Sequence, residues 1–297
     1  MQIMSPPLFH KCVSGADLKR LHQALLDNVL GALKEDIGST NPSGDHTAKL
    51  IPEDKTARAY IISREHAVIC GLPWAQTCFT QLDPHVQLEW LVSEGDIVRP
   101  DQPLVRIEGQ ARAMLTAERS ALNFLQTLSA TATETRRFVD AVKGCHCEIL
   151  DTRKTLPGLR LAQKYAVLVG GGRNQRLGLY DGILVKENHI AAAGSIAQAL
   201  RMASEVGHGI PVQIEVENLE DLRIALDAGA TSILLDNFSH SALAEAVRIN
   251  QKRAILEASG GIRYENIRTV ALTGVDRISI GHLTKDIRAI DLSMRFE

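Results

Sequence analysis

Apolar residues at helical spacing dominate the first part of the chain. They recur every three or four positions between Leu18 and Leu33, and again along LTAERSALNFLQTLSATATETRRFVDAV, residues 115–142. This period predicts two amphipathic helices, and the second helix is expected to join two halves of the protein. Short alternating runs, ARAYIIS and VQLEWLV, predict strands interleaved with the helices. We therefore expect a mixed α/β region without a parallel sheet up to about residue 110.

The pattern changes from residue 147 onward to short apolar runs that end in polar residues. The runs are CEILDT, GILVKENH, VQIEVEN, SILLDN, AILEASGG and RISIGH. Helix-length intervals such as AAAGSIAQALRMASEVGHG separate several of them, which predicts parallel strands with crossover helices. A doubly wound sheet has a similar pattern, and six runs fall short of an eight-strand barrel. An incomplete α/β barrel is the fold we favour.

In such a barrel the functional groups gather at the carboxyl ends of the strands. The polar ends of the runs are therefore expected to form one site. They are Asp151, Arg153, Lys154, Lys186, Glu187, Asn188, His189, Glu215, Glu217, Asn218, Asp236, Asn237, Ser259 and His282.

Composition limits the classes of partner. The 297 residues are 45% apolar and 23% charged, enough for one large core or two smaller ones. The net charge of -2 provides no overall basic field, so neither nucleic acid nor a membrane is expected as a partner. Five scattered cysteines favour a reducing compartment, and the start MQIMSPPLFHKC lacks the apolar core of a signal peptide. These features predict a cytoplasmic protein.

A local cluster of cations surrounds the segment DTRKTLPGLR. Between residues 151 and 176, one acid, Asp151, stands against Arg153, Lys154, Arg160, Lys164, Arg173 and Arg176. Arginine forks and lysine charges together suit a ligand with several anionic groups. Gly170, Gly171 and Gly172 either let backbone amides approach a phosphate or end a helix, and the sequence leaves both readings open.

Acidic residues occupy other strand ends. Glu215 and Glu217 alternate and so share a strand face, and Asp236 ends the next run. Such carboxylates beside phosphate suit Mg²⁺, although one of them could instead pair with Lys186 or an arginine. Cys145, His146 and Cys147 have a spacing close to that of metal ligands, but their place before a strand favours core cysteines and an exposed histidine.

Two other functions are compatible with parts of the pattern. Lys186, with Glu187 and His189 nearby, is compatible with a Schiff-base lysine of an aldolase. The segment VSEGDIVRPDQPLVRIEG is similar to the hammerhead of biotinyl and lipoyl carrier domains, and it would suit a noncatalytic binding protein. It lacks the exposed lysine of those carriers, which favours a small supporting sheet.

Longer motifs resemble one enzyme family. They are DTRKTLPGLR, GGGRNQRLGLYDGILVKENH, IEVEN, LLDN, ASGGI, LTKDIRAIDLSMRFE, EDIGSTNPSGDHTAKLIPE and LTAERSALNFLQTLS. Together, in their order along the chain, they resemble quinolinate phosphoribosyltransferase, the nicotinate-nucleotide pyrophosphorylase. The resemblance implies a mixed α/β N-terminal sandwich domain at 1–128 and an incomplete seven-strand α/β barrel at 129–282. It also implies a tail, about 283–297, that returns to the first domain, and a homodimer in which one subunit's first domain caps the other's barrel.

The resemblance also implies the reaction and the residues that serve it. Quinolinate and phosphoribosyl pyrophosphate would form nicotinate mononucleotide, pyrophosphate and carbon dioxide with Mg²⁺. Quinolinate would contact Arg153, Arg176, Lys186 and, across the subunit interface, Arg119. Lys154, Glu215 and Asp236 would address ribose, pyrophosphate and metal, and with Lys186 they form the expected catalytic set. Further substrate contacts would come from Thr152, Ser259, Gly260, Gly261, Gly281, His282 and Leu283.

One position departs from the family pattern. Many members carry histidine before the arginine of the N-H-R-L-G-L motif, whereas this chain has Gln175. Glutamine donates a hydrogen bond but carries no charge, so quinolinate affinity and its pH dependence are left open by the sequence. A related transferase acting on another aromatic acid therefore stays an alternative.

Overall fold

The computed structural model describes residues 15–38 and 44–297, and these divide into two compact units. The N-terminal unit comprises the described residues up to Glu134, residues 156–171 and residues 286–297. The barrel unit comprises residues 135–155 and 172–285. Cys12 and part of the EDIGSTNPSGDHTAKLIPE motif lie outside the described residues.

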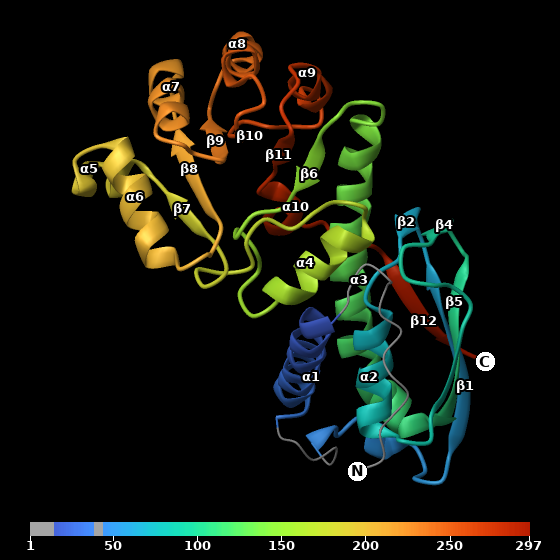
Figure 1. Ribbon diagram of the computed structural model, residues 1–297. Helices are drawn as coiled ribbons and strands as arrows, with labels where there is room; N and C mark the ends of the chain where they lie inside the picture. The colour runs from blue at the N-terminus through green and yellow to red at the C-terminus, as the bar shows by residue number, and fades with distance from the viewer. Residues whose placement is uncertain (1–14, 39–43) are drawn as a thin grey trace. The chain divides into compact units, whose positions relative to one another are not determined.

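The N-terminal unit contains a four-stranded antiparallel sheet and its helices (Figure 1). The sheet has the order β12-β1-β5-β3, and β2 and β4 form a separate two-stranded sheet. The strands are β1 (Thr56–Ser63), β2 (Ala67–Val68), β3 (Gln87–Trp90), β4 (Ile97–Val98), β5 (Pro103–Gln110) and β12 (Leu292–Phe296). The helices are α1 (Gly15–Ile37), η2 (Ala48–Leu50), α2 (Leu72–Leu82), α4 (Arg160–Val169) and the first part of α3 (Ala111–Ala141).

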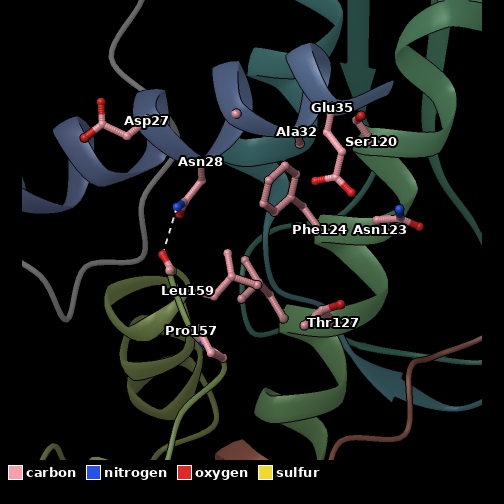
Figure 2. A pocket seen from close by; sticks show the side chains of 13 residues that line it. Asp27, Asn28, Ala32, Glu35, Ser120, Asn123, Phe124, Thr127, Pro157 and Leu159 are labelled. Carbon is pink, nitrogen blue, oxygen red and sulfur yellow. Dashed lines mark hydrogen bonds between the residues drawn. The ribbon is translucent and has the colours of Figure 1, made fainter. Parts of the chain in front are cut away.

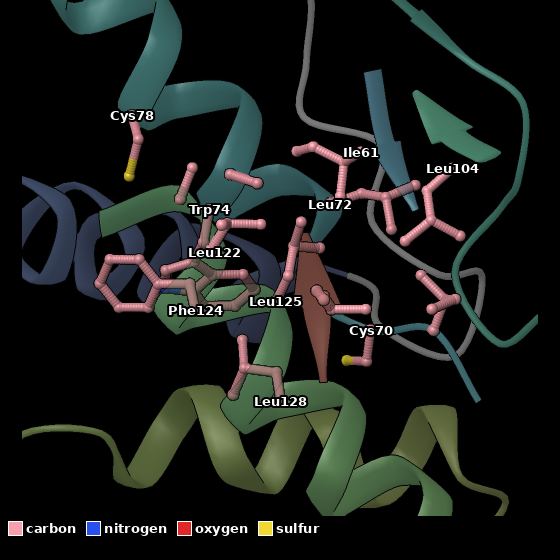
Figure 3. Packing of buried hydrophobic residues seen from close by; sticks show 14 of the residues in the cluster. Ile61, Cys70, Leu72, Trp74, Cys78, Leu104, Leu122, Phe124, Leu125 and Leu128 are labelled. Atoms are coloured by element: carbon pink, nitrogen blue, oxygen red, sulfur yellow. The ribbon is translucent and has the colours of Figure 1, made fainter. Parts of the chain in front are cut away.

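The predicted helical period of α1 is confirmed by burial. Leu21, Leu25, Val29 and Leu33 are at most 6% exposed, whereas Leu30, off the stripe, is 49% exposed. The buried stripe belongs to the same apolar core as α2, α3 and strands β1 and β5, part of which Figure 3 shows. Burial of these apolar side chains is the main source of stability in this unit.

The barrel unit confirms all six predicted strands. Every neighbouring pair is parallel, and the order is β6-β11-β10-β9-β8-β7. The strands are β6 (Glu148–Leu150), β7 (Ile183–Val185), β8 (Val212–Val216), β9 (Ser232–Asp236), β10 (Ile255–Ser259) and β11 (Arg277–Ser279). The helices are α5 (Glu187–Ala193), α6 (Ile196–Gly207), α7 (Leu219–Asp227), α8 (His240–Asn250), α9 (Ile267–Leu272) and α10 (His282–Lys285), and α6 to α9 lie along the outer side of the sheet (Figure 1).

The barrel is incomplete, as expected, but it has six strands where the resemblance implied seven. Among the described residues, a single parallel bridge between Leu150 and Arg173 stands at the seventh position. Arg173 N donates to Ile149 O at 2.8 Å, and Asp151 N donates to Arg173 O at 3.2 Å. The sheet therefore runs from this bridge through β6 to β7 without closing.

Strand alternation separates an apolar outer face from a polar inner face. In β8, Ile214 and Val216 are almost fully buried in the core beneath the helices, so Gln213 and Glu215 point to the opposite face. In β10, Leu256 and Ala258 belong to the same core, which places Glu257 on the inner face. The inner face therefore carries polar side chains on β8 and β10, beside apolar ones such as Leu234 of β9.

Helix α3 contributes residues to both units, as predicted for a joining helix. Strand β12, near the end of the chain, pairs with β1 in the N-terminal unit. The predicted domain limits at 128 and 282 stay a prediction. Over residues 15–38 and 44–297, no helix combines the length and the apolar character needed to cross a membrane.

Candidate active site

The ends of the parallel strands bring most of the predicted polar residues to one edge of the barrel unit. Lys186 follows β7, Glu215 lies near the end of β8, Asp236 ends β9 and Ser259 ends β10. Because adjacent strands in this sheet are parallel, these ends lie next to one another in the order of the sheet. Three groups of contacts organise the edge.

The first group is an ion pair between Lys186 and Glu215. Lys186 Nζ donates to both carboxylate oxygens of Glu215, at 2.8 and 2.7 Å. The Glu215 side chain is only 10% exposed and that of Lys186 is 43% exposed. The alternative in which an acid pairs with Lys186 is therefore confirmed for Glu215. The largely desolvated Glu215 carboxylate thus holds the Lys186 ammonium group at the carboxyl ends of β7 and β8.

The second group joins Lys154, Thr152 and Gly281. A side chain at Gly281 would come within 2.9 Å of the Lys154 side chain and 3.6 Å of Thr152 Oγ1. The absence of a β-carbon thus lets the lysine lie across the turn that follows β11. Thr152 Oγ1 also accepts a hydrogen bond from Lys154 N at 3.1 Å, and Lys154 O accepts one from Thr284 Oγ1 at 2.7 Å.

The third group lies where β9 and β10 end. Asp236 and Ser259 are register partners, and Asn237 N donates to Ser259 O at 2.9 Å. Gly260 has a φ of +88°, and a side chain there would collide with the Asn237 amide. Glycine is therefore required for the tight approach of these two turns. Asn237 Nδ2 donates to Asp236 Oδ2 at 2.7 Å, which orients the carboxylate.

Arg153 and Arg176 are close enough for their charges to interact. Burial lowers the pKa of Arg176, and the nearby charge of Arg153 lowers it further while Asp181 opposes the shift. Two neighbouring guanidinium groups favour an anion between or beside them. The Arg176 guanidinium donates to Gly182 O at 3.0 Å, just before β7 begins.

Several residues of the predicted basic rim lie elsewhere, and their assignment to the rim is corrected. Arg160 and Lys164 belong to α4 in the N-terminal unit, and Lys164 is only 1% exposed. Arg173 pairs with Glu148 at the opposite, amino end of β6. Gly170 caps α4 and Gly171 has a φ of +93°, so these glycines end a helix.

Some of the polar residues predicted at the strand ends lie at the starts of helices α5 and α7. Asn218 caps α7, accepting hydrogen bonds from Glu220 N and Asp221 N at 3.0 and 2.9 Å. His189 Nδ1 accepts from Lys186 N at 3.0 Å at the start of α5. Glu217 lies beyond the end of β8 and is exposed, so it does not share the strand face of Glu215. Glu187 and Asn188 are exposed residues of the first turn of α5.

The turn Gly281–His282–Leu283 is placed by packing. The His282 ring packs on Phe138 with centroids 4.9 Å apart, and the Leu283 side chain is buried in the barrel core. Only the main chain of Leu283 is thus suited to contact a ligand. This turn begins α10, and the first N–H groups of a helix have no partners within it. Arg119 is an exposed residue of α3 in the N-terminal unit.

Sequence reasoning missed a buried polar network inside the barrel. Gln213 and Glu257 are 8% and 1% exposed, and Gln213 Nε2 donates to Glu257 Oε2 at 2.9 Å. Asp151 is fully buried and accepts hydrogen bonds from Gln175 N and Asn174 Nδ2 at 2.9 and 2.7 Å. The available clue was an acid within an apolar run, as Glu257 is in AILEASGG.

No group of three or more histidine, cysteine, aspartate or glutamate side chains suited to a metal ion occurs in the described parts of the chain. Cys145 and Cys147 are half-buried against the barrel core and His146 is exposed, in line with the structural reading of this segment. Burial raises the pKa of Cys147 to about 11.

Two hollows differ in their chemistry. One, of about 480 Å³, opens at the amino ends of the strands and is lined by Gln175, Arg176, Gln213, Glu257 and Arg277 among others, so the structure places Arg176 near the start of β7 and Lys186 at the end of the same strand. The other, of about 430 Å³, lies in the N-terminal unit between α1, α3 and the turn at 157–159 (Figure 2). Its charged lining residues are both acidic, Asp27 and Glu35, so it does not suit an anionic substrate.

An incomplete parallel α/β barrel with cations and carboxylates at its strand ends defines an α/β-barrel enzyme whose site suits small, multiply charged molecules. Comparison with known proteins specifies the family. The model of the quinolinate phosphoribosyl transferase N-terminal domain matches residues 45–129, and that of the C-terminal domain matches residues 131–295. The chain belongs to the quinolinate phosphoribosyltransferase family.

Individual relatives agree along most of their length. A probable nicotinate-nucleotide pyrophosphorylase (carboxylating) of Bacillus subtilis is 39% identical over 261 residues, covering 88% of this chain and 89% of the relative. A mitochondrial quinolinate phosphoribosyltransferase (decarboxylating) of Nicotiana tabacum is 37% identical over 286 residues, 90% of this chain and 80% of the relative. The solved nicotinate-nucleotide pyrophosphorylase of Francisella tularensis has a TM-score of 0.89 and 43% identity, covering 93% of this chain and 96% of that one.

Proposed function

We propose that the protein transfers the phosphoribosyl group of phosphoribosyl pyrophosphate to quinolinate, with loss of carbon dioxide. The products are nicotinate mononucleotide and pyrophosphate, which places the reaction in the formation of NAD. Membership of the family supports this assignment. The observation that supports it is the row of charged side chains at the carboxyl ends of one parallel sheet: Lys186 bound to Glu215, Asp236 on the neighbouring strand, and Lys154 across the turn that follows β11.

The charges of the two substrates fit the layout of the site. Quinolinate carries two carboxylates, for which Arg153, Arg176 and Lys186 supply positive charge. Arginine forks bind carboxylates in a defined orientation, so these contacts would set the direction of the pyridine ring. The ion pair with Glu215 holds Lys186 at its strand end before quinolinate arrives.

The phosphoribosyl donor carries a 5-phosphate and a pyrophosphate. Lys154, which lies across Gly281, is placed to meet phosphate oxygens near the turns that follow β10 and β11. The backbone at Gly260, Gly261 and residues 281–283 offers N–H groups to the same oxygens. Thr152 and Ser259 add hydroxyl groups, and the Asp236 carboxylate suits the ribose hydroxyls or a cation bound to pyrophosphate.

The chemistry asks the protein to align two reactants and to stabilise a leaving group. Attack of the pyridine nitrogen on the anomeric carbon expels pyrophosphate through an oxocarbenium-like transition state. Positive charge from Lys154 stabilises the departing pyrophosphate, and the arginine contacts hold the ring nitrogen in line. The quaternary nitrogen then stabilises the carbanion left when the adjacent carboxylate departs as carbon dioxide, and a proton from solvent takes the place of the lost carboxylate on the ring carbon.

Mg²⁺ accompanies the phosphoribosyl donor in this proposal. Mg²⁺ typically takes one or two protein carboxylates and completes its shell with phosphate oxygens and water. Asp236 fits this role, directly or through water. Glu215 fits it less well, because both of its oxygens already accept hydrogen bonds from Lys186. The ion would supply charge neutralisation to the leaving pyrophosphate.

Assembly and location complete the proposal. We infer a homodimer in which Arg119, an exposed residue of α3, reaches the partner subunit's quinolinate site. The cysteines of the described residues, Cys70, Cys78, Cys145 and Cys147, are all free thiols, which supports a reducing compartment such as the cytoplasm.

The rival functions lose support from the same contacts. A Schiff-base lysine acts as a free amine in a desolvated pocket, whereas Lys186 is 43% exposed and bound to a carboxylate. In the hammerhead-like segment, β4 pairs with β2, and β5 is an inner strand of the antiparallel sheet. This favours the supporting role over that of a carrier domain.

The decisive experiment mixes purified protein with quinolinate, phosphoribosyl pyrophosphate and Mg²⁺ and measures pyrophosphate and carbon dioxide. We expect equimolar release of both that requires quinolinate and stops when EDTA removes the metal. Nicotinate and other aromatic acids in place of quinolinate test the related-transferase alternative. Release with one of them but not with quinolinate would reassign the substrate, and no release with any acid would refute a transferase.

A further inference from the structure

A line of hydrogen bonds crosses the interior of the barrel unit from Arg176 to β10. Arg176 N donates to Gln175 Oε1 at 2.7 Å, and Gln175 Nε2 donates to Gln213 Oε1 at 2.8 Å. Gln213 Nε2 then donates to Glu257 Oε2 at 2.9 Å and to Ser232 Oγ at 3.2 Å. The line thus joins the residue expected to bind quinolinate to a buried carboxyl group on β10, three strands away from β7.

The direction of this line is fixed by its first member. A main-chain N–H only donates, so the Gln175 oxygen must face Arg176 and its amide nitrogen must face Gln213. The same constraint turns the Gln213 oxygen toward Gln175 and its nitrogen toward Glu257. The last group has to accept, which is what a carboxyl oxygen does.

The burial of Glu257, the last residue of the line, indicates a role beyond packing. Glu257 is 1% exposed, and burial raises its pKa, with the hydrogen bond from Gln213 as the strongest opposing influence. Within the described residues, Glu257 Oε1 and the hydroxyl of Ser279 make no hydrogen bond of good geometry, although Ser279 lies close enough to Glu257 to lower its pKa. Burying an incompletely satisfied acid costs stability, so its retention favours a role other than packing.

A second anchor acts on the same short segment. Asp151, which is fully buried, accepts hydrogen bonds from Gln175 N and Asn174 Nδ2. Gln175 is therefore held through its main chain by Asp151 and through its side chain by Gln213. Both anchors lie immediately before Arg176, in the segment that links the Arg173 bridge to β7.

We infer that Gln213 and Glu257 are positioning residues for quinolinate, acting through Gln175 on the main chain at Arg176. The inference rests on the proposed function, because Arg176 is a quinolinate contact only in that proposal. Neither Gln213 nor Glu257 needs to touch the substrate. Their effect is expected in quinolinate binding and not in the binding of the phosphoribosyl donor, for which other residues are proposed.

The test measures steady-state kinetics of Gln213→Leu, Glu257→Leu and Glu257→Gln against the unmodified protein. Gln213→Leu removes two hydrogen bonds of the line and Glu257→Leu removes one, and we expect KM for quinolinate to rise about three- to tenfold in each. The kcat value and KM for phosphoribosyl pyrophosphate should stay within about twofold. Glu257→Gln retains an acceptor for Gln213 and gains a donor for Ser279, so its KM should stay within about twofold.

Asn250→Leu controls for loss of stability. The Asn250 side chain is buried in the same unit and forms hydrogen bonds with the C=O and N–H groups of Ala254, which are not part of the line. It should lower the thermal midpoint without raising KM for quinolinate. The inference is wrong if the leucine variants leave KM for quinolinate unchanged, or if they lower kcat and raise both KM values alike. An unmodified protein that releases no pyrophosphate refutes the proposed function instead, and the inference with it.

Discussion

Single side chains in the site derive their roles from what surrounds them. Lys186 and Glu215 both follow or end apolar runs in the sequence, but the hydrogen bonds between them make them a single ion pair. Arg153 and Arg176 act differently, since each bears a positive charge near the other. The second pair brings two like charges together, which favours an anion near them, whereas the first pair joins a cation to an anion.

Arg153→Ala is predicted to weaken quinolinate binding by roughly ten- to hundredfold, because a charge-assisted hydrogen bond contributes about 1.5 to 3 kcal/mol. Isothermal titration calorimetry measures the change directly. Arg253→Ala is the matched control, since Arg253 pairs with Asp227 at 3.1 Å, outside the site residues named above. A change of less than about twofold for Arg153→Ala would remove this arginine from the site.

Helices and strands follow the sequence pattern closely, but their ends depend on contacts that the pattern does not reveal. The start of α2 is an example. Glu94, distant in sequence, accepts hydrogen bonds from Gly71 N and Leu72 N at 2.8 and 2.6 Å and from the Tyr165 hydroxyl at 2.9 Å. A buried carboxylate thus satisfies N–H groups at a helix start that local side chains leave open.

The surroundings of Glu94 predict a pH-dependent stability. Burial raises its pKa from 4.5 to about 7, against the hydrogen bonds that lower it. Between these values the folded state holds the proton and the unfolded state does not. The stabilisation that Glu94 gives to the folded state is therefore complete below about pH 4.5 and is lost as the pH rises through 7. The free energy of unfolding should fall by roughly 3 kcal/mol over this range.

Thermal unfolding of the unmodified protein and of Glu94→Gln between pH 4.5 and 8 checks this prediction. As the pH rises, the thermal midpoint of the unmodified protein should fall relative to that of Glu94→Gln. The difference between the two midpoints should become constant above about pH 7. Glu118 and Glu257, whose pKa values are also raised by burial, are present in both proteins and cancel in the difference. Parallel curves would show that Glu94 does not titrate in this range.

The whole molecule contains two hydrophobic cores, one in each unit, and α3 contributes residues to both. Residues 156–171 and 286–297 belong to the N-terminal unit although the sequence places them within or after the barrel. Lys186 belongs to the barrel unit and Arg119 to the N-terminal unit, and the proposed dimer would bring these two residues to the same quinolinate. Whether the two come from one subunit or from two is a property of the assembly.

Complementation between two inactive variants distinguishes these arrangements. If Arg119 acts across a dimer interface, a mixed dimer of Arg119→Ala and Lys186→Ala subunits contains one intact site. Coexpression should then restore about a quarter of the unmodified activity, because half of the dimers are mixed and each has one working site. If Arg119 serves its own subunit, both sites in the mixed dimer are defective and no activity returns. Sedimentation analysis of the coexpressed protein confirms the dimer.

The sequence by itself determined the strand and helix periods, the parallel barrel strands and the family motifs. These depend on local spacing of apolar residues and on runs such as DTRKTLPGLR, which adjacent residues define. Tertiary structure alone decided that Glu215 pairs with Lys186, that Lys164 is buried, and that Gln175 connects to Glu257 through Gln213. Those outcomes depend on which strands become neighbours and on which face each side chain points, and contacts between residues distant in sequence leave no local pattern to read.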